Sequence, residues 1–277
     1  MLHSSVIISV YRDIQALSLI LQALSRQTIQ GFEVIISQDG DDIEVINFVR
    51  DVDTTFPVIH LTQPDQGFQK NRALNRAILA ANSERLIFID GDCIPHDRFI
   101  ESHLKHLTKG VVTAGRRVEL GPNISQRVRQ NAISLDNINS NAWWWTHIYS
   151  LIKDKTKGVE LVLAPKAFIG TMLNRKIALL GSNFGAYKSD LITINGFNEE
   201  YKEAGIGEDT DIEWRLRECN VTLVNIKFSA LQWHLYHERI YQLSDNNIKI
   251  LLRTKQNHEI VATHGLNSHN ISQDINQ

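Results

Sequence analysis

The sequence predicts an α/β fold, a single domain whose central sheet is mostly parallel and carries helices on both faces. The first third of the chain contains four short apolar runs, at residues 6–10, 32–37, 57–61 and 85–89. Each run is continuously apolar, as in parallel strands that are covered on both faces. Helical patterns separate the runs, and this alternation gives a doubly wound sheet with its ligand crevice at the carboxyl ends of the strands.

The first helical pattern follows residue 10, where apolar side chains recur on one stripe: Ile14, Leu17, Leu21 and Leu24. Gly31 ends that helix before the second strand. Residues 42–50 and 70–81 supply the next two crossover helices. Each strand of the first third is therefore followed by an element that can return the chain for a parallel strand.

The pattern changes after residue 120. Residues 121–180 lack strand periodicity and include three consecutive tryptophans at 143–145, of which at least one should be exposed, because neighbouring side chains point in different directions. A second regular block follows, with apolar runs or helical patterns at residues 182–187, 208–219, 221–226 and 228–233. Beyond residue 240 we expect a C-terminal helix and a frayed polar tail.

Composition excludes several classes of protein. The 277 residues are 43% hydrophobic and carry a formal net charge of -2, which favours no nucleic-acid partner. Two cysteines without a CxxC pair read as reduced thiols of a cytosolic protein. With no long apolar stretch, the sequence predicts a cytoplasmic protein, either free or peripherally bound to the inner face of a membrane.

The strongest local signal follows the fourth apolar run, where Asp90, Gly91 and Asp92 end a buried strand at the binding edge of the sheet. The glycine allows a tight turn between the two carboxylates. Magnesium or manganese at a diphosphate commonly uses one or two protein carboxylates. The alternative is that these aspartates only cap the following helix.

Two further signals lie in the second block. Glu208 and Asp209 begin an amphipathic helix after Gly205 and Gly207, which suggests a mobile loop that carries fixed acids. The alternative is ordinary helix-start chemistry, since acids suit the positive end of a helix.

His234 follows the run at 228–233; such a histidine is often structural, but beside an Asp-x-Asp pair it can ligate a manganese-like metal.

In this order the motifs resemble the family 2 glycosyltransferases with the GT-A fold, and the C-terminal half is similar to galactosyltransferase and chondroitin-polymerase-type enzymes. The similar segments include the first strand and its donor-contacting turn, the uracil-contacting second strand end, the nucleotide-proximal helix, the metal motif, the segments that lead into the catalytic loop, and the Glu-Asp motif: residues 6–13, 37–41, 66–77, 90–92, 181–184, 195–199 and 207–211. In this family a tryptophan often stands just before the Glu-Asp motif, and this sequence has no tryptophan at that place.

The resemblance implies an inverting enzyme that transfers a hexose or N-acetylhexosamine from a UDP-sugar to a saccharide or lipid-linked saccharide, in surface polysaccharide or lipopolysaccharide synthesis. Mn²⁺ or Mg²⁺ would be the cofactor. Residues 1–240 would form the GT-A domain, followed by the helix and tail at 241–277. Within it, residues 1–120 would bind the nucleotide, 121–180 would be a variable acceptor-side insert, and 181–240 would be the acceptor and catalytic half.

The resemblance also implies roles for individual residues. Asp209 would be the catalytic base and Glu208 would bond the donor or acceptor sugar. Asp92 and His234 would hold the metal, with His237 as the substitute ligand and Asp90 at the ribose or a metal-bound water. The full set of expected donor-binding residues is Tyr11, Asp13, Asp39, Gln66, Lys70, Arg72, Asp90, Gly91, Asp92 and Asn183.

Rival functions remain open at this point. A metal-dependent nucleotidyltransferase shares a similar sheet, but it would normally show a glycine-rich loop after the first strand, where residues 11–13 have none. A haloacid-dehalogenase-type phosphatase would carry its Asp-x-Asp on the first strand. A non-catalytic sugar-binding module would not need both acidic motifs. Residues 143–145 could stack an acceptor sugar, contact a membrane or belong to the core.

Overall fold

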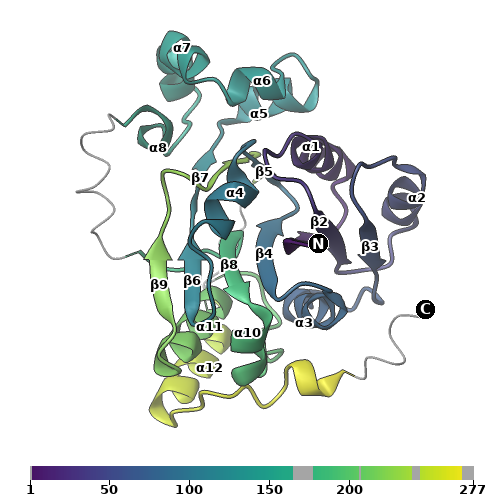
Figure 1. Ribbon diagram of the computed structural model, residues 1–277, viewed down its shortest axis with the longest axis vertical. Helices are drawn as coiled ribbons and strands as arrows, with labels where there is room; N and C mark the ends of the chain where they lie inside the picture. Colours follow the sequence, from purple (N-terminus) through teal and green to yellow (C-terminus); the bar gives the residue numbers. More distant parts are fainter. Residues whose placement is uncertain (1, 165–176, 206, 239–243, 270–277) are drawn as a thin grey trace.

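The computed structural model describes residues 2–164, 177–205, 207–238 and 244–269 (Figure 1). Among them, a seven-stranded sheet has the order β3-β2-β1-β4-β8-β6-β9. Its strands are β1 (Ser4–Val10), β2 (Phe32–Gln38), β3 (Val58–Leu61), β4 (Arg85–Asp90), β6 (Val111–Ala114), β8 (Asn183–Tyr187) and β9 (Thr222–Asn225). All neighbours are parallel except at β8, which runs antiparallel to both β4 and β6. The predicted mostly parallel sheet is confirmed.

Helices cover both faces of the parallel half. Helices α1 (Ile14–Ser25) and α2 (Ile43–Asp51) pack on one face, and α3 (Lys70–Ala80) packs on the other. Side chains alternate along β1, so that Val6 belongs to the first core cluster and Ile7 to the second. Both are fully buried, which explains why the strand is apolar without alternation.

A second, three-stranded sheet was not predicted. It has the order β5-β10-β7, formed by β5 (Cys93–Pro95), β7 (Arg116–Glu119) and β10 (Leu231–His234). Helix α4 (Phe99–Leu104) follows β5 in the chain. Strand β10 pairs antiparallel with β5, and its last residue, His234, lies opposite Cys93. This pairing brings the end of β10 next to the turn that follows β4.

The described part of the insert is helical and lies at one end of the molecule (Figure 1). It contains α5 (Pro122–Arg129), α6 (Leu135–Ile138), α7 (Asn141–Lys153) and α8 (Glu160–Leu163). The three tryptophans lie on α7, where Trp144 is fully buried and Trp145 is 58% exposed. The expectation that at least one is exposed is confirmed. Residues 165–176 of the expected insert lie outside the described residues.

The second half adds α10 (Lys188–Thr193), α11 (Glu208–Glu218), α12 (Asp245–Gln256) and a 3₁₀ turn at Leu266–Ser268. Helix α12 is the expected C-terminal helix. The end of the polar tail, residues 270–277, and Ile206 of the expected mobile loop lie outside the described residues. In the described ranges, no helix combines the length and apolar character that a membrane crossing requires.

Candidate functional site

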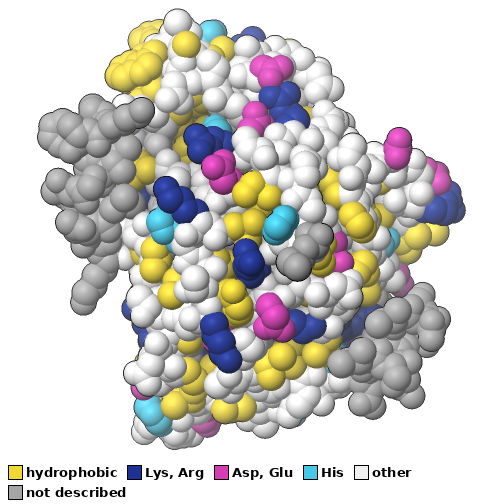
Figure 2. Space-filling model, viewed as in Figure 1, with side chains coloured by type: hydrophobic (Ala, Val, Ile, Leu, Met, Phe, Trp, Pro, Cys, Tyr) yellow, Lys and Arg dark blue, Asp and Glu magenta, His cyan; other side chains and the backbone are white. Residues whose placement is uncertain are grey.

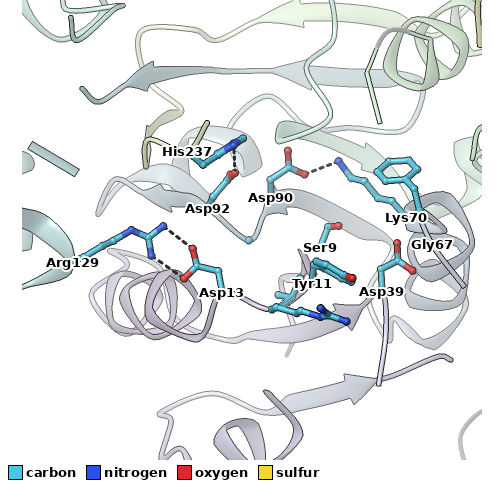
Figure 3. A pocket seen from close by; sticks show the side chains of 14 residues that line it. Ser9, Tyr11, Asp13, Asp39, Gly67, Lys70, Asp90, Asp92, Arg129 and His237 are labelled. Atoms are coloured by element: carbon cyan, nitrogen blue, oxygen red, sulfur yellow. Dashed lines mark hydrogen bonds and ion pairs between the residues drawn. The ribbon is translucent and has the colours of Figure 1, made fainter. Parts of the chain in front are cut away.

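The carboxyl ends of β1, β2 and β4 border a cavity of about 670 Å³ (Figure 3). Its lining is Ser9, Val10, Tyr11, Arg12, Asp13, Asp39, Gly67, Phe68, Lys70, Asp90, Gly91, Asp92, Arg129 and His237. Most of the residues expected to bind the donor therefore line one cavity. It lies where parallel strands of a doubly wound sheet place a ligand.

Gly91 explains how the turn after β4 packs against β1. Its amide donates a hydrogen bond of 2.7 Å to the carbonyl oxygen of Ser9. A β-carbon at this position would lie 2.7 Å from that same oxygen, closer than a side chain tolerates. With the turn held in this way, Asp90 and Asp92 reach different partners (Figure 3).

Asp92 lies against two histidines. Its Oδ2 is 3.4 Å from Nε2 of His234 and 3.2 Å from Nε2 of His237. One ligand atom each of Asp92, Cys93 and His234 lies within 4.8 Å of the others. Burial raises the pKa of Asp92, but the hydrogen bonds from the two histidines outweigh it and hold that pKa well below its usual range. Asp92 is therefore an anion at neutral pH.

This donor set fits a divalent cation. Two ligands that each lie roughly 2.1 Å from a metal, at a right angle, are about 3 Å apart, close to the distances around Asp92. One carboxylate with two imidazoles suits manganese and other borderline cations. The structure brings together Asp92, His234 and the substitute His237.

Asp90 has a different environment. Its Oδ1 accepts a 2.8 Å hydrogen bond from Nζ of Lys70, and Nη1 of Arg117 is 3.9 Å from its Oδ2. Burial lowers the pKa of Lys70, but the carboxylates of Asp90, Asp209 and Glu208 outweigh it and leave the pKa above its usual value. Lys70 is thus a permanent cation that interacts both with Asp90 and with the acids of α11.

Glu208 and Asp209 begin α11, and both carboxylates act electrostatically on Lys70. Burial and the neighbouring Asp209 raise the pKa of Glu208 to about 7, against the opposing effect of Lys70. Burial likewise raises the pKa of Asp209, while Lys70 and the amide of Gly181 lower it. These two acids do not line the 670 Å³ cavity. They form a site that can take up a proton near neutral pH.

Gly181 fixes the carboxylate of Asp209. Its amide donates a 2.8 Å hydrogen bond to Oδ2. A β-carbon on Gly181 would lie 2.1 Å from Oδ1 of the same carboxylate. The carboxylate therefore occupies space that only glycine leaves free.

The β2 end of the cavity carries the expected nucleotide contacts. Asp39 accepts hydrogen bonds from Nε2 of Gln63 at 2.7 Å and from the amide of Gln69 at 2.8 Å, and burial raises its pKa. The hydroxyl of Tyr11 donates to Asp65 at 2.9 Å. Tyr11 is half exposed, and the guanidinium of Arg12 lies over its ring, 4.6 Å from the ring centroid.

Asp13 and Arg129 form the opposite side. Asp13 caps α1 by accepting from the amide of Ala16, and it forms a two-pronged ion pair with Arg129 at 2.8 and 2.6 Å (Figure 3). Sequence reasoning missed Arg129, and it also missed Arg117 beside Asp90. Both are cations in segments without a recognised motif, so no sequence signal separated them from solvated surface residues.

The structure does not bring three expected donor contacts into the cavity. Asn183 is fully buried; its amide donates to the carbonyl oxygens of Arg116 and Ala230, and its Oδ1 lies 3.1 Å from Nε2 of His103. We therefore withdraw Asn183 as a donor contact, because these protein groups occupy it. Gln66 and Arg72 are not among the residues that line the cavity.

A second cavity of about 380 Å³ lies beyond the histidines. It is lined by Glu119, Leu120, Gly121, Pro122, Lys155, Lys157, His234, Tyr236 and His237. His237 lines both cavities, so the expected metal ligands separate the strand-edge cavity from one bordered by the helical insert.

Residues 5–174 match the family model described as Glycosyl transferase family 2. Chondroitin synthase of Escherichia coli is 24% identical over 233 residues, which are 76% of this chain and 32% of that protein. Glycosyltransferase AglE of Haloferax volcanii is 28% identical over 118 residues, 42% of this chain and 39% of that one. The chain thus spans 32% and 39% of the length of these two relatives.

Solved structures show the same fold. GalNAc-T7 with UDP, GalNAc and Mn²⁺ superposes with a TM-score of 0.61 at 12% identity, over 92% of this chain and 48% of that one. The mannosyltransferase PcManGT of Pyrobaculum calidifontis, in complex with GDP-Man and Mn²⁺, gives 0.55 at 14% identity, over 86% and 58%. TarS of S. aureus gives 0.55 at 16% identity, over 97% and 41%. These likenesses establish the GT-A fold.

Proposed function

The chain belongs to glycosyltransferase family 2, and on that premise we propose that it is an inverting hexosyltransferase that uses a UDP-sugar and Mn²⁺ or Mg²⁺. One observation carries the proposal. Asp92 lies against two histidines, and two residues before it Asp90 pairs with Lys70, which also interacts electrostatically with the acidic pair Glu208 and Asp209. Transfer from a nucleoside diphosphate needs both a bound cation and a proton acceptor at one site.

The donor would bind in the 670 Å³ cavity, with the base between Tyr11 and Asp39 and the diphosphate near Asp92. Asp90 would contact the ribose or a metal-bound water. A metal held by Asp92 and His234 would neutralise the charge of the departing diphosphate. Of the solved structures above, GalNAc-T7 holds UDP and the mannosyltransferase holds GDP-Man, so the nucleotide is the first property to test.

Asp209 would act as the base. The acceptor hydroxyl oxygen attacks the anomeric carbon, the bond from that carbon to the diphosphate oxygen breaks, and the nucleoside diphosphate leaves with the electron pair. The acceptor proton passes to Asp209, whose raised pKa suits proton uptake. Attack from the face opposite the leaving group inverts the configuration.

The division of labour along the chain follows from this arrangement. Residues 1–120 would bind the nucleotide, and residues 181–240 would supply the base and the histidine ligand. Residues 121–180 would border the acceptor, since the second cavity lies between this insert and the histidines. We propose a saccharide or lipid-linked saccharide of a surface polysaccharide as acceptor, as the name of the relative chondroitin synthase suggests.

Calorimetry tests the donor half of the proposal. UDP, GDP and CMP are titrated into the protein, each with Mn²⁺ and with a chelator. We expect UDP to bind most tightly and only with metal. Equal binding of the three nucleotides, or indifference to the chelator, would contradict the proposal. Release of UDP from a panel of UDP-hexoses, with saccharide acceptors added, then identifies the sugar.

A further inference from the structure

An apolar stripe runs along α7 on the side that faces away from the core. Trp145, Tyr149 and Ile152 are 58%, 77% and 65% exposed. Their spacing of four and three residues places them on one face of the helix, over a length of roughly 10 Å. Figure 2 shows hydrophobic side chains gathered over α7 at the upper end of the molecule. We call Trp145, Tyr149 and Ile152 the α7 stripe.

A neighbouring face of α7, about 100° round the helix from the stripe, anchors the helix. Trp144 and Leu151 are fully buried. The indole of Trp144 donates a 2.7 Å hydrogen bond to the carbonyl oxygen of Ile138 and stacks on Trp233 of β10 with ring centroids 5.1 Å apart. Because these contacts fix the rotation of α7, the stripe cannot turn inward. Its exposure belongs to the folded protein.

The charges around the stripe are basic. Helix α7 has no acidic residue, and its last residue, Lys153, is followed by Lys155 and Lys157, all exposed; Lys157 lies 3.9 Å from the carboxylate of Glu119. Asp154 is buried and accepts hydrogen bonds from the amides of Asn123 and Ile124, so its carboxylate faces the protein interior and not the surface beside the stripe. On the neighbouring helices, Asp136 is paired with Arg26, and Glu160 is exposed. Lys153 and Lys155 are therefore the positive charges next to the C-terminal end of the stripe.

We propose that the α7 stripe docks on an anionic lipid surface. Tryptophan and tyrosine suit the boundary between headgroups and acyl chains, where the ring is buried and its polar group stays wet. A helix lying flat on such a surface buries one apolar face, while lysines beside it attract acidic headgroups. A second copy of the chain fits less well, because three side chains on one helix fall far short of the roughly 800 Å² per partner that a stable interface buries.

Docking would place lipid beside the second cavity. Lys155 and Lys157 follow the stripe directly and line that cavity together with His234 and His237. An acceptor whose saccharide is carried on a lipid could therefore reach the histidine side of the site from the docked surface. This consequence rests on the proposed function. The docking itself does not.

Co-sedimentation with vesicles tests the docking on the full chain. We expect binding to vesicles of equal parts phosphatidylcholine and phosphatidylglycerol, and weaker binding to phosphatidylcholine alone. The triple variant Trp145→Ser, Tyr149→Ser, Ile152→Ser should bind at least tenfold more weakly, because each large apolar side chain gains more than a factor of ten when buried. Lys153→Gln with Lys155→Gln should lose roughly fivefold per lysine, on the anionic vesicles only. Leu252→Ser, at a side chain 62% exposed on α12, is the matched control and should bind like wild type.

Three outcomes overturn the proposal: no binding of wild type to anionic vesicles, equal loss in Leu252→Ser, or a wild-type dimer that the triple variant dissociates in sedimentation equilibrium. Unchanged circular dichroism and melting temperature show that the variants fold. UDP titration with Mn²⁺ on the same samples separates the two proposals. In wild type, absent docking with intact UDP binding refutes only the lipid surface, whereas intact docking without UDP binding refutes only the proposed donor.

Discussion

The two acidic clusters of the site, around Asp92 and around Glu208 and Asp209, have pKa values that are shifted in opposite directions. Asp92 faces two imidazoles, and its pKa lies well below the usual value. Glu208 faces Asp209 in a buried setting, and its pKa is raised to about 7. Burial raises the pKa in each cluster, so the partners of the carboxylate make the difference.

This difference indicates a division of labour. Titratable groups whose environments drive their pKa values apart mark distinct roles in a reaction. A carboxylate that stays ionised can hold a cation, whereas one with a raised pKa can accept a proton at neutral pH. Lys70 pairs with Asp90 and also interacts electrostatically with Glu208 and Asp209, so its charge offsets that of all three acids.

Replacing the base should have the largest effect. Asp209→Asn keeps the size of the side chain but removes its capacity to accept a proton. We expect turnover to fall about 10²–10⁴-fold with UDP affinity nearly unchanged, because the nucleotide and metal contacts come from other elements. Steady-state transfer and calorimetry with UDP measure the two quantities.

Asp92→Asn is the matched variant in the other cluster. It should lose metal-dependent UDP binding together with turnover. If Asp209 only complemented the positive end of α11, Asp209→Asn would cost about 0.3–1 kcal/mol of stability and leave activity intact. More than about a tenth of wild-type turnover in Asp209→Asn would remove it as the base and make Glu208 the next acid to replace.

Displacing the base without changing its chemistry should have the next largest effect. In Gly181→Ala the added methyl group would meet Oδ1 of Asp209 at 2.1 Å, so the carboxylate must move. We expect a loss of turnover of up to about 10²-fold, because a shift of an ångström at a catalytic group can cost that much. UDP affinity is the internal control. A fully active Gly181→Ala enzyme would show that the position of Asp209 does not matter.

Replacing the histidines tests the expected metal ligands of the Asp92 cluster. His234→Ala should weaken Mn²⁺ binding at least tenfold and leave the fold intact, because one ligand of the expected metal is lost. Mn²⁺ paramagnetic resonance measures the affinity, and His237→Ala is the paired variant. If only His237→Ala loses metal, the ligand is His237 and His234 merely supports Asp92.

The parallel half of the fold was predictable because its strands are buried on both faces. The ends of β1, β2, β3 and β4 agree with the expected ranges within two residues. The second sheet left no such signal. Strand β7 is four residues long and includes Arg116, Arg117 and Glu119. Its pairing with β10 depends on tertiary contacts that periodicity cannot reveal.

The site was predictable where motifs follow strands and unpredictable where packing decides. Asp90, Gly91 and Asp92 lie together at the edge of the cavity because a buried strand ends there. Asn183 also lies at a strand end but turns inward, because Gly115 leaves room for it; a β-carbon there would lie 2.1 Å from its Oδ1. The sequence marks polar residues near the edge of a sheet but not the direction in which they point.

The smallest effect we predict concerns pH. Because Glu208 holds a proton up to about pH 7, wild-type turnover should fall as the pH drops below that value and the acidic pair becomes protonated. Glu208→Gln removes one of the two repelling charges, so the fall should move to lower pH by roughly one unit.

The pH dependence of folding stability tests the pKa of Glu208 independently of turnover. The pKa of Glu208 in the folded chain is raised above its ordinary value of 4.5, so its stabilising contribution is complete below about pH 4.5 and is lost as the pH rises through about 7. Wild type should therefore lose about 1–3 kcal/mol between pH 5 and 7.5 that Glu208→Gln does not lose. Thermal melts of both proteins across this range measure the difference. Parallel melting curves would show that Glu208 is ionised throughout, and the acid limb of the rate profile would then belong to Asp209 alone.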